Sequence, residues 1–223
     1  FDVIYSQSLF ERLYKELPAS KKVMLRKQFR MHPQIGRLVS RLFYPEGLQH
    51  GLPEDALANT SGVYDGYHLA WVNVPFEAGG ESRRYVNEAE AKAVIKLVKQ
   101  LVKDAKNIGN ISIITFYAEQ LNYLKKQLQN HGLEKQVAVG TVDAFQGKES
   151  DIVILSTVRS NDFKQESRAL GFLRSPNRLN VAISRARSLL IVVGDVKTLR
   201  KSKMFNDVYE YIEECGYVDE HRR

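Results

Sequence analysis

A chain of 223 residues with 43% hydrophobic and 26% charged residues can bury a core, and its length fits one large domain. The net charge of +7 suggests a polyanionic partner but does not identify one. A single cysteine excludes an internal disulfide, and no apolar run reaches the ~20 residues that span a bilayer. We therefore expect an intracellular, reducing location, which is the cytoplasm, or the nucleus if the organism is eukaryotic. The start, FDVI, has neither an initiator Met nor a signal-peptide layout, which suggests a piece of a longer protein.

Hydrophobic periodicity and capping residues predict alternating helices and strands along the chain. Helices are expected at residues 6–17, 31–43, 87–104, 117–130 and 176–186, and strands at 68–74, 111–116, 137–142, 151–158 and 189–195. Residues 45–65 are interpreted as a surface connection, 159–175 as a mobile loop, and the end of the chain as one or two helices. Several of the strands are apolar on both faces, which is typical of a parallel sheet covered by helices on both sides.

Three polar blocks interrupt this pattern. The first, QFRMHP, places Arg30 just before a helix start, where an arginine can face a ligand at the edge of an α/β sheet. A capped helix with a solvated arginine is the plain alternative.

The second block, GTVDAFQGKE, crowds polar side chains between two strands, where they can bind phosphate, ribose or a nucleic-acid backbone. A charged surface loop is the alternative. The block is not a Walker A motif, because six residues separate Gly140 from Gly147, and Glu149 stands where Ser or Thr is needed.

The third block, RLNVAISRAR, is expected on a helix, where Arg178 and Arg185 would lie near one line because about two turns separate them. A guanidinium aimed at a γ-phosphate is the arginine-finger device. A basic helix end beside a buried strand would have the same composition.

Taken together, four stretches resemble the second RecA-like lobe of superfamily 1 (1B) helicases, the group of the nonsense-mediated-decay RNA helicase, senataxin and the immunoglobulin mu-binding helicase. The stretches are QFRMHP (28–33), IITFYAEQ (113–120), TVDAFQGKESDIVILSTVRS (141–160) and GFLRSPNRLNVAISRARSLLIVVGD (171–195). The resemblance covers nearly the whole chain. It implies an α/β fold with a RecA-like parallel sheet and helices on both faces, a second lobe of the P-loop NTPase type without its own Walker A motif.

The resemblance also implies a role for each matching residue. Arg30 and Arg185 are expected to be catalytic and to reach the γ-phosphate. The expected nucleotide-binding residues are Phe29, which stands where the family usually has Tyr, and Gln146, Gly147 and Glu149. The expected nucleic-acid-binding residues are Thr115, Tyr117, Thr141, Asp143 and Arg187. For Arg187 a second role, tying the sheet together, stays open.

ATP hydrolysis also needs a P-loop Lys, a Ser or Thr for Mg²⁺ and acidic residues, which the family carries on its first lobe. We therefore expect ATP with Mg²⁺ held mainly by a lobe upstream of Phe1, and no metal site in this chain. Residues 1–20 are expected to connect to that lobe, 21–215 to form the C-terminal lobe, and 216–223 to form a tail. The expected partners are the upstream lobe and single-stranded RNA or DNA, with no membrane.

The expected function is that of the C-terminal motor lobe of an ATP-dependent helicase, inactive alone. A nucleic-acid-binding module without an ATPase role would explain the charge but not the set Arg30, Glu149 and Arg185. A small-molecule kinase would need the missing Walker A motif. A purely structural lobe is disfavoured because all three blocks keep their charged residues.

Overall fold

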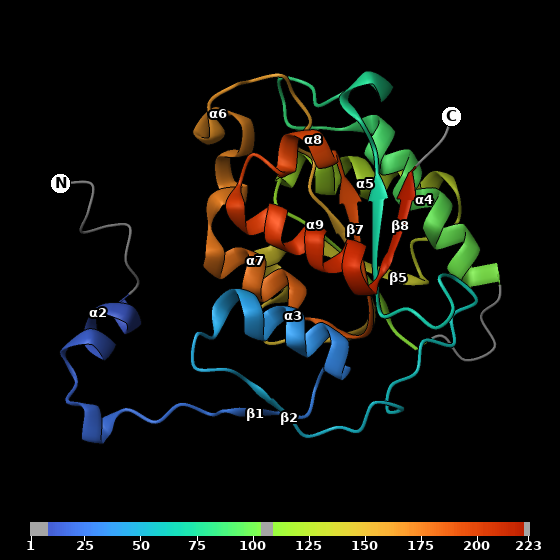
Figure 1. Ribbon diagram of the computed structural model, residues 1–223. Coiled ribbons are helices and arrows are strands. Elements are labelled where there is room, and N and C mark those ends of the chain that lie inside the picture. The colour runs from blue at the N-terminus through green and yellow to red at the C-terminus, as the bar shows by residue number, and fades with distance from the viewer. Residues whose placement is uncertain (1–8, 104–108, 221–223) are drawn as a thin grey trace.

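The computed structural model describes residues 9–103 and 109–220, and its centre is a six-stranded sheet of parallel strands (Figure 1). The strand order is β5-β4-β6-β7-β3-β8, and every neighbouring pair is parallel. The strands are β3 (Leu69–Asn73), β4 (Ile111–Thr115), β5 (Val137–Thr141), β6 (Ser150–Ser156), β7 (Ala186–Gly194) and β8 (Tyr217–Glu220). The predicted α/β fold class is confirmed.

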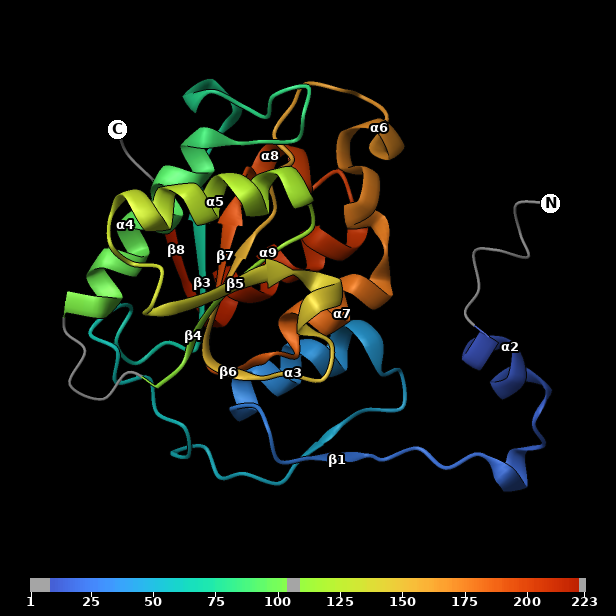
Figure 2. The same ribbon diagram turned by 180° about the vertical axis from the view of Figure 1, so that it is seen from behind.

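Helices cover both faces of the sheet, as Figures 1 and 2 show from opposite sides. One face is covered by α4 (Glu88–Lys103) and α5 (Ala118–Asn130), and the other by α3 (Pro33–Phe43), α7 (Pro176–Ile183) and α9 (Lys203–Cys215). Neighbouring residues of one strand enter different cores: Ile191 packs with α4 and α5, and Val192 packs with the opposite helices. A strand buried on both faces must be apolar throughout, which explains the continuous apolar runs in the sequence.

Shorter elements complete the described chain. They are α2 (Leu9–Glu16), η1 (Ala19–Lys21), β1 (Lys27–Gln28), β2 (Gln49–His50), η2 (Phe76–Ala78), η3 (Val142–Phe145), α6 (Glu166–Leu170), η4 (Gly171–Arg174) and α8 (Val196–Leu199). Strands β1 and β2 form a separate parallel pair. Helix α2 lies away from the sheet in both views.

Local sequence explains where α3 begins. The side chain of His32 accepts a hydrogen bond from the backbone N–H of Gln34, and Pro33 occupies the first turn, where its missing N–H costs nothing. The helices predicted at 87–104 and 117–130 agree with α4 and α5, and residue 104 lies outside the described part. The helix predicted at 6–17 is observed as α2, and its first residues, 6–8, lie outside the described part as well. Two helices, α8 and α9, follow β7 as predicted.

The mobile loop predicted at 159–175 is wrong. The segment contains α6 and η4, and Ala169, Leu170 and Leu173 are fully buried. Its polar start is buried too: the hydroxyl of Ser160 donates to Asp195 at 3.0 Å, and the backbone N–H of Asn161 donates to Oγ1 of Thr198 at 3.0 Å. Polar residues that pair with one another inside the protein look like loop residues in the sequence.

Two further boundaries differ from the prediction. Helix α7 ends at Ile183 and β7 begins at Ala186, so Arg185 lies beyond the helix and not on one helical line with Arg178. Residues 217–220, expected in a tail, form β8, the strand at one side of the sheet, paired with β3. The apolar contact of Val218 with the core and its register with Trp71 place this strand.

The parallel direction gives the sheet two distinct edges. We call the edge where the strands begin the amino edge, marked by Ser150 and Ala186, and the edge where they end the carboxyl edge, marked by Thr115 and Ser156. In residues 9–103 and 109–220, no helix combines the length and apolarity that crossing a bilayer requires.

Candidate functional site

The predicted site residues divide between the two edges of the sheet. Arg30, Glu149, Arg185 and Arg187 meet at the amino edge, and Thr115, Tyr117, Thr141 and Asp143 follow or end strands at the carboxyl edge. The predicted site residues therefore form two separate groups on one lobe.

At the amino edge, the carboxylate of Glu149 lies between two guanidinium groups. Its Oε2 accepts from Nε of Arg30 at 2.9 Å, and its Oε1 lies 3.8 Å from Nε of Arg187. Arg187 also pairs with Asp151, with Nη1 3.5 Å from Oδ1. All four side chains are partly exposed, so these pairs contribute only about 0–1 kcal/mol each to stability. Their effect is to fix the direction of the guanidinium groups.

The turn that carries Arg30 is held by Gln28. The Gln28 side-chain oxygen accepts from the backbone N–H groups of Arg30 and Met31, at 2.9 and 2.8 Å. Phe29, between them, is 62% exposed, and its ring lies so close to Gly51 that a Cβ there would meet Cε1 at 2.2 Å. The turn therefore presents an aromatic ring and a guanidinium together on the surface.

Arg185 is only 8% exposed, and each guanidinium nitrogen has an oxygen partner within the lobe. Nη1 donates to the carbonyl of Lys148 at 2.8 Å, Nε donates to the carbonyl of Val181 at 3.0 Å, and Nη2 donates to Oγ of Ser184 at 3.0 Å. Burial, followed by the nearby charge of Arg30, lowers the pKa of Arg185 from its ordinary value. Arginine nevertheless stays charged, so a buried positive charge lies directly behind Arg30 and Glu149.

The second block forms one wall of a hollow at the amino edge. Gly147 and Glu149 line this hollow of about 680 Å³ with Ser112 and Ser150, and the volume is within the range of small-molecule sites. Gln146 is exposed and follows η3. Gly147 has φ +83 and nothing within 4 Å of a Cβ position, so its role is a left-handed turn in an open place.

At the carboxyl edge, Thr115 is fully buried, and its Oγ1 has no hydrogen-bond partner among the described residues. Tyr117 is 4% exposed, and its hydroxyl donates to the carbonyl of Leu170 at 3.4 Å. Burial raises the pKa of Tyr117. Thr141 is half-buried, and Asp143 is exposed and lies 3.3 Å from Nη2 of Arg178. The four residues predicted to contact nucleic acid therefore differ widely in exposure: Thr115 and Tyr117 are buried, whereas Asp143 is exposed.

A buried carboxylate, which the sequence analysis missed, holds the loop after β6. Glu90 is fully buried, and both of its oxygens accept from the backbone N–H of Val158 at 2.9 Å. Ser156 donates to Oε1 at 2.5 Å, and Thr157 is 3.4 Å from Oε2. Val158 has φ +73, which is an outlier for a β-branched residue and needs such support. Burial raises the pKa of Glu90 to about 8.

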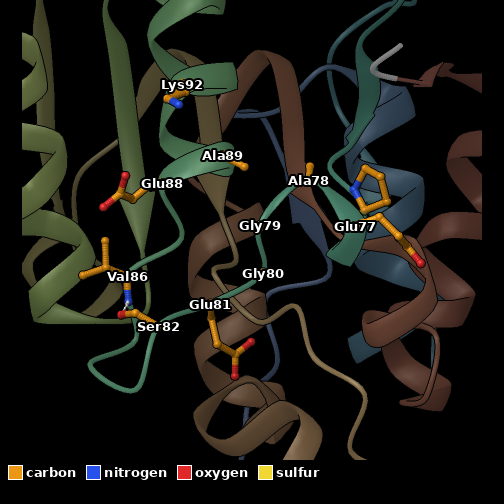
Figure 3. A pocket seen from close by; sticks show the side chains of 11 residues that line it. Glu77, Ala78, Gly79, Gly80, Glu81, Ser82, Val86, Glu88, Ala89 and Lys92 are labelled. Carbon is orange, nitrogen blue, oxygen red and sulfur yellow. Dashed lines mark hydrogen bonds between the residues drawn. The ribbon is translucent and has the colours of Figure 1, made fainter. Parts of the chain in front are cut away.

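The next residue of that loop, Arg159, is also buried and paired. Its Nε donates to the carbonyl of Ala169 at 2.7 Å and lies 3.2 Å from Oε1 of Glu81. Burial raises the pKa of Glu81. Figure 3 shows that Glu81 points away from Glu88 and Lys92, which line another part of the same 580 Å³ hollow. Glu81 thus lines one end of the hollow and also holds the loop after β6.

The fold defines the class of protein: a RecA-like α/β lobe whose site residues lie at the two edges of one parallel sheet. A family model described as an AAA domain matches residues 5–197. A putative regulator of nonsense transcripts 1 from Takifugu rubripes is 36% identical over 91% of this chain, and the yeast ATP-dependent helicase NAM7 is 34% identical over 98%. A mouse 5'-3' DNA helicase, ZGRF1, is 37% identical over 93%.

The chain belongs to this AAA domain family and is a helicase domain of the superfamily 1B type. It spans 19% of the length of the Takifugu protein, 23% of the yeast protein and 11% of the mouse protein. The solved C-terminal domain of a possible DNA helicase from Lactobacillus plantarum WCFS1 aligns with a TM-score of 0.50 and 17% identity, over 86% of this chain and 99% of that chain. That likeness supports the fold.

Proposed function

We propose that this chain is the C-terminal motor lobe of an ATP-dependent helicase. In this proposal, residues 1–20 connect to an upstream lobe that holds ATP and most of the Mg²⁺ ligands, and Arg30 and Arg185 act on that ATP. The cluster of Arg30, Glu149, Arg185 and Arg187 carries the proposal, because three separate blocks of sequence converge on it at the amino edge.

The chemistry of the cluster fits a phosphoryl group. Transfer of a γ-phosphoryl group develops negative charge that fixed guanidinium groups stabilise, and such arginines raise turnover by about 10³–10⁵. Arg30 is exposed and aimed by Glu149, so it can approach a nucleotide across a cleft. The exposed ring of Phe29 beside it offers a flat apolar surface for the nucleotide base, and Gln146 and Glu149 supply groups that can bond to ribose.

Buried Arg185 supports this site in a different way. Its guanidinium bridges the end of α7 and the carbonyl of Lys148, next to Glu149. Contact with a phosphate would require it to exchange at least one of these oxygens for a phosphate oxygen. Closure of the two lobes is the step that would provide that oxygen, which makes this arginine sensitive to nucleotide.

The second half of the proposal is a grip on single-stranded nucleic acid at the carboxyl edge. Thr141, Asp143 and the neighbourhood of Tyr117 lie there, and the chain carries a net charge of +7. Opening and closing of the cleft would then move the lobe along the strand. A nucleic-acid-binding module without an ATPase role remains the second candidate, and binding that changes with the nucleotide separates the two.

Steady-state ATP hydrolysis tests the proposal. The purified chain is assayed alone, with single-stranded RNA or DNA, and with the upstream lobe supplied. We expect no turnover by the chain alone and turnover, stimulated by the strand, when the upstream lobe is present. Robust turnover by these 223 residues alone, with contaminants excluded, would contradict a half-motor.

A further inference from the structure

Three aromatic rings from separate segments stand in a row at the carboxyl edge. Tyr85 stacks on Tyr117 with centroids 4.9 Å apart and planes 17° apart, and Tyr117 meets Phe172 at 5.8 Å and 39°. Tyr85 comes from the loop before α4, Tyr117 follows β4, and Phe172 lies in η4. The central ring is buried, but Tyr85 is 41% exposed and Phe172 is 59% exposed.

We infer that Tyr85 and Phe172 form a platform on which nucleobases of a single strand stack. This inference rests on the proposed function and adds to it a contact to bases, whereas the proposed grip needs only backbone contacts. The predicted Tyr117 would then act as the support between the two exposed rings and not as a contact to the strand.

Arginines lie beside the aromatic rings. The guanidinium carbon of the partly exposed Arg178 lies 5.5 Å from the centre of the Phe172 ring. That of Arg159 lies 5.2 Å from the centre of the Tyr85 ring, but Arg159 is buried and supports the ring from within. A third pair, Arg168 over Phe163 at 4.6 Å, lines the adjoining hollow of about 480 Å³. Stacked aromatics combined with cations are the means by which proteins hold single strands, because the rings take the bases and the cations take the phosphates.

The platform is built rigidly. Tyr85 has φ +56, an unusual conformation for a bulky residue, and its N–H donates to the carbonyl of Ser82 at 3.0 Å. Phe172 lies in η4 between the buried residues Leu170 and Leu173, which anchor the turn that carries the exposed ring. Backbone strain of this kind reduces stability, and it persists mainly where a site has a function.

The surface fits a single strand better than a duplex. Bases within a duplex are already stacked on each other and expose only their edges, whereas an unpaired base offers its flat face. The platform also lies at the end of β4, where Thr115 and Tyr117 mark the expected strand path, although both side chains are buried. Tyr85 and Phe172 are the exposed groups at that place.

An abasic strand tests the platform. The complete protein that carries this lobe is titrated with a single-stranded oligonucleotide and with an abasic strand of the same length and charge. The variants are Tyr85→Leu, Phe172→Leu and the double variant. Each single variant is expected to bind the normal strand about tenfold more weakly, because base stacking contributes about 1–3 kcal/mol per base. The abasic strand should bind all variants equally, and the dependence on salt should not change.

Tyr67→Leu is the matched control, since Tyr67 is an exposed aromatic that also contacts a second ring, Tyr217, but precedes β3 at the amino edge. Thermal unfolding checks that each variant is folded, and Phe172, the more exposed ring, is the variant least able to disturb the core. Equal binding of both strands by the wild-type protein, or unchanged binding by the double variant, would overturn the platform alone. Absence of any strand binding by the wild-type protein would overturn the proposed function and the platform with it.

Discussion

The Nε atom of Arg30 lies 2.9 Å from Oε2 of Glu149, although the two residues are 119 positions apart in the sequence. The contact joins the first polar block to the second and aims an exposed guanidinium. Because the pair is partly exposed, its loss should affect catalysis more than stability.

A double-mutant cycle in the complete protein tests this relationship. We expect Arg30→Ala and Glu149→Gln each to lower ATP turnover, and the double variant to lose less than the product of the two losses, with a coupling of about 0.5–3 kcal/mol. The same cycle on Arg26 and Glu46, an exposed pair at 2.6 Å outside the cluster, should leave turnover unchanged. Strictly multiplicative losses at Arg30 and Glu149 would show that the carboxylate does not position the arginine.

Arg185 should be essential for hydrolysis and not for ATP binding. In the complete protein, Arg185→Ala is expected to reduce single-turnover hydrolysis by about 10³-fold or more. The substitution also leaves the carbonyls of Val181 and Lys148 without the donor that Arg185 supplies, which lowers stability by about 1–3 kcal/mol. Unfolding is therefore measured in parallel. Arg41→Ala is the control that should retain turnover, because Arg41 pairs with the exposed Glu214 outside both groups of predicted site residues. Normal hydrolysis by a folded Arg185→Ala protein would refute the assignment.

Glu90 should give the stability of the lobe a distinctive dependence on pH. Burial raises its pKa from 4.5 to about 8, so between these values the native state keeps a proton that the unfolded state releases. The free energy of unfolding therefore falls as pH rises through this window, by up to about 1.4 kcal/mol per unit. Glu90→Gln has no such proton, and its amide can still accept from Val158. Measured by denaturant unfolding, the stability of the variant relative to the wild-type protein should therefore increase from pH 5 to pH 8.

Other groups that titrate in this window do not disturb the comparison. Burial lowers the pKa of His32, His50 and His68, and all three are present in both proteins. Glu81, the charged neighbour that raises the pKa of Glu90 further, is also retained. A difference in stability that stays constant from pH 5 to pH 8 would mean that Glu90 is ionised in the folded protein.

A side chain at Gly171 should destabilise the lobe. It has φ +53 and ψ −121, and a Cβ there would lie 3.2 Å from the hydroxyl oxygen of Tyr117. We expect Gly171→Ala to lower the free energy of unfolding by about 1–3 kcal/mol. Gly132→Ala is the control, because Gly132 has φ +66 but nothing within 4 Å of the added carbon. If both variants lose the same free energy of unfolding, the backbone conformation alone causes the loss, and the contact with Tyr117 contributes nothing.

Much of the fold could be predicted because periodicity reports burial directly. The apolar run of β4 and the amphipathic pattern of α4 each follow from a face that must be covered. The segment 159–175 could not be predicted, since Ser160 and Asn161 are buried through partners that lie far away in the sequence. The strand β8 was missed because four residues with two charges give no periodic signal.

The candidate site was predicted only as single residues. The resemblance indicated Arg30 and Glu149 separately, and the structure shows that they are in contact. The role of Glu90 had no signal, because a glutamate in the first turn of a helix is also what a helix dipole favours. The row of Tyr85, Tyr117 and Phe172 depends on three segments meeting at one edge, which spacing along the chain does not encode.

Strand β6 connects the group of residues at the amino edge with the group at the carboxyl edge. Glu149 precedes its first residue, and Ser156, its last, donates to Glu90 beside the strained turn at Val158. The strand has seven residues, and the six steps between its ends, at about 3.3 Å each, make it about 20 Å long. Strands β4 and β7 on either side resist its bending. If a nucleotide bound Arg30 and displaced Glu149, the displacement would be transmitted along β6. It would reach the turn at Val158, which leads to Arg159 and the Tyr85 ring. In the proposed motor, the sheet that forms the core would also couple the nucleotide at one edge to the single strand at the other.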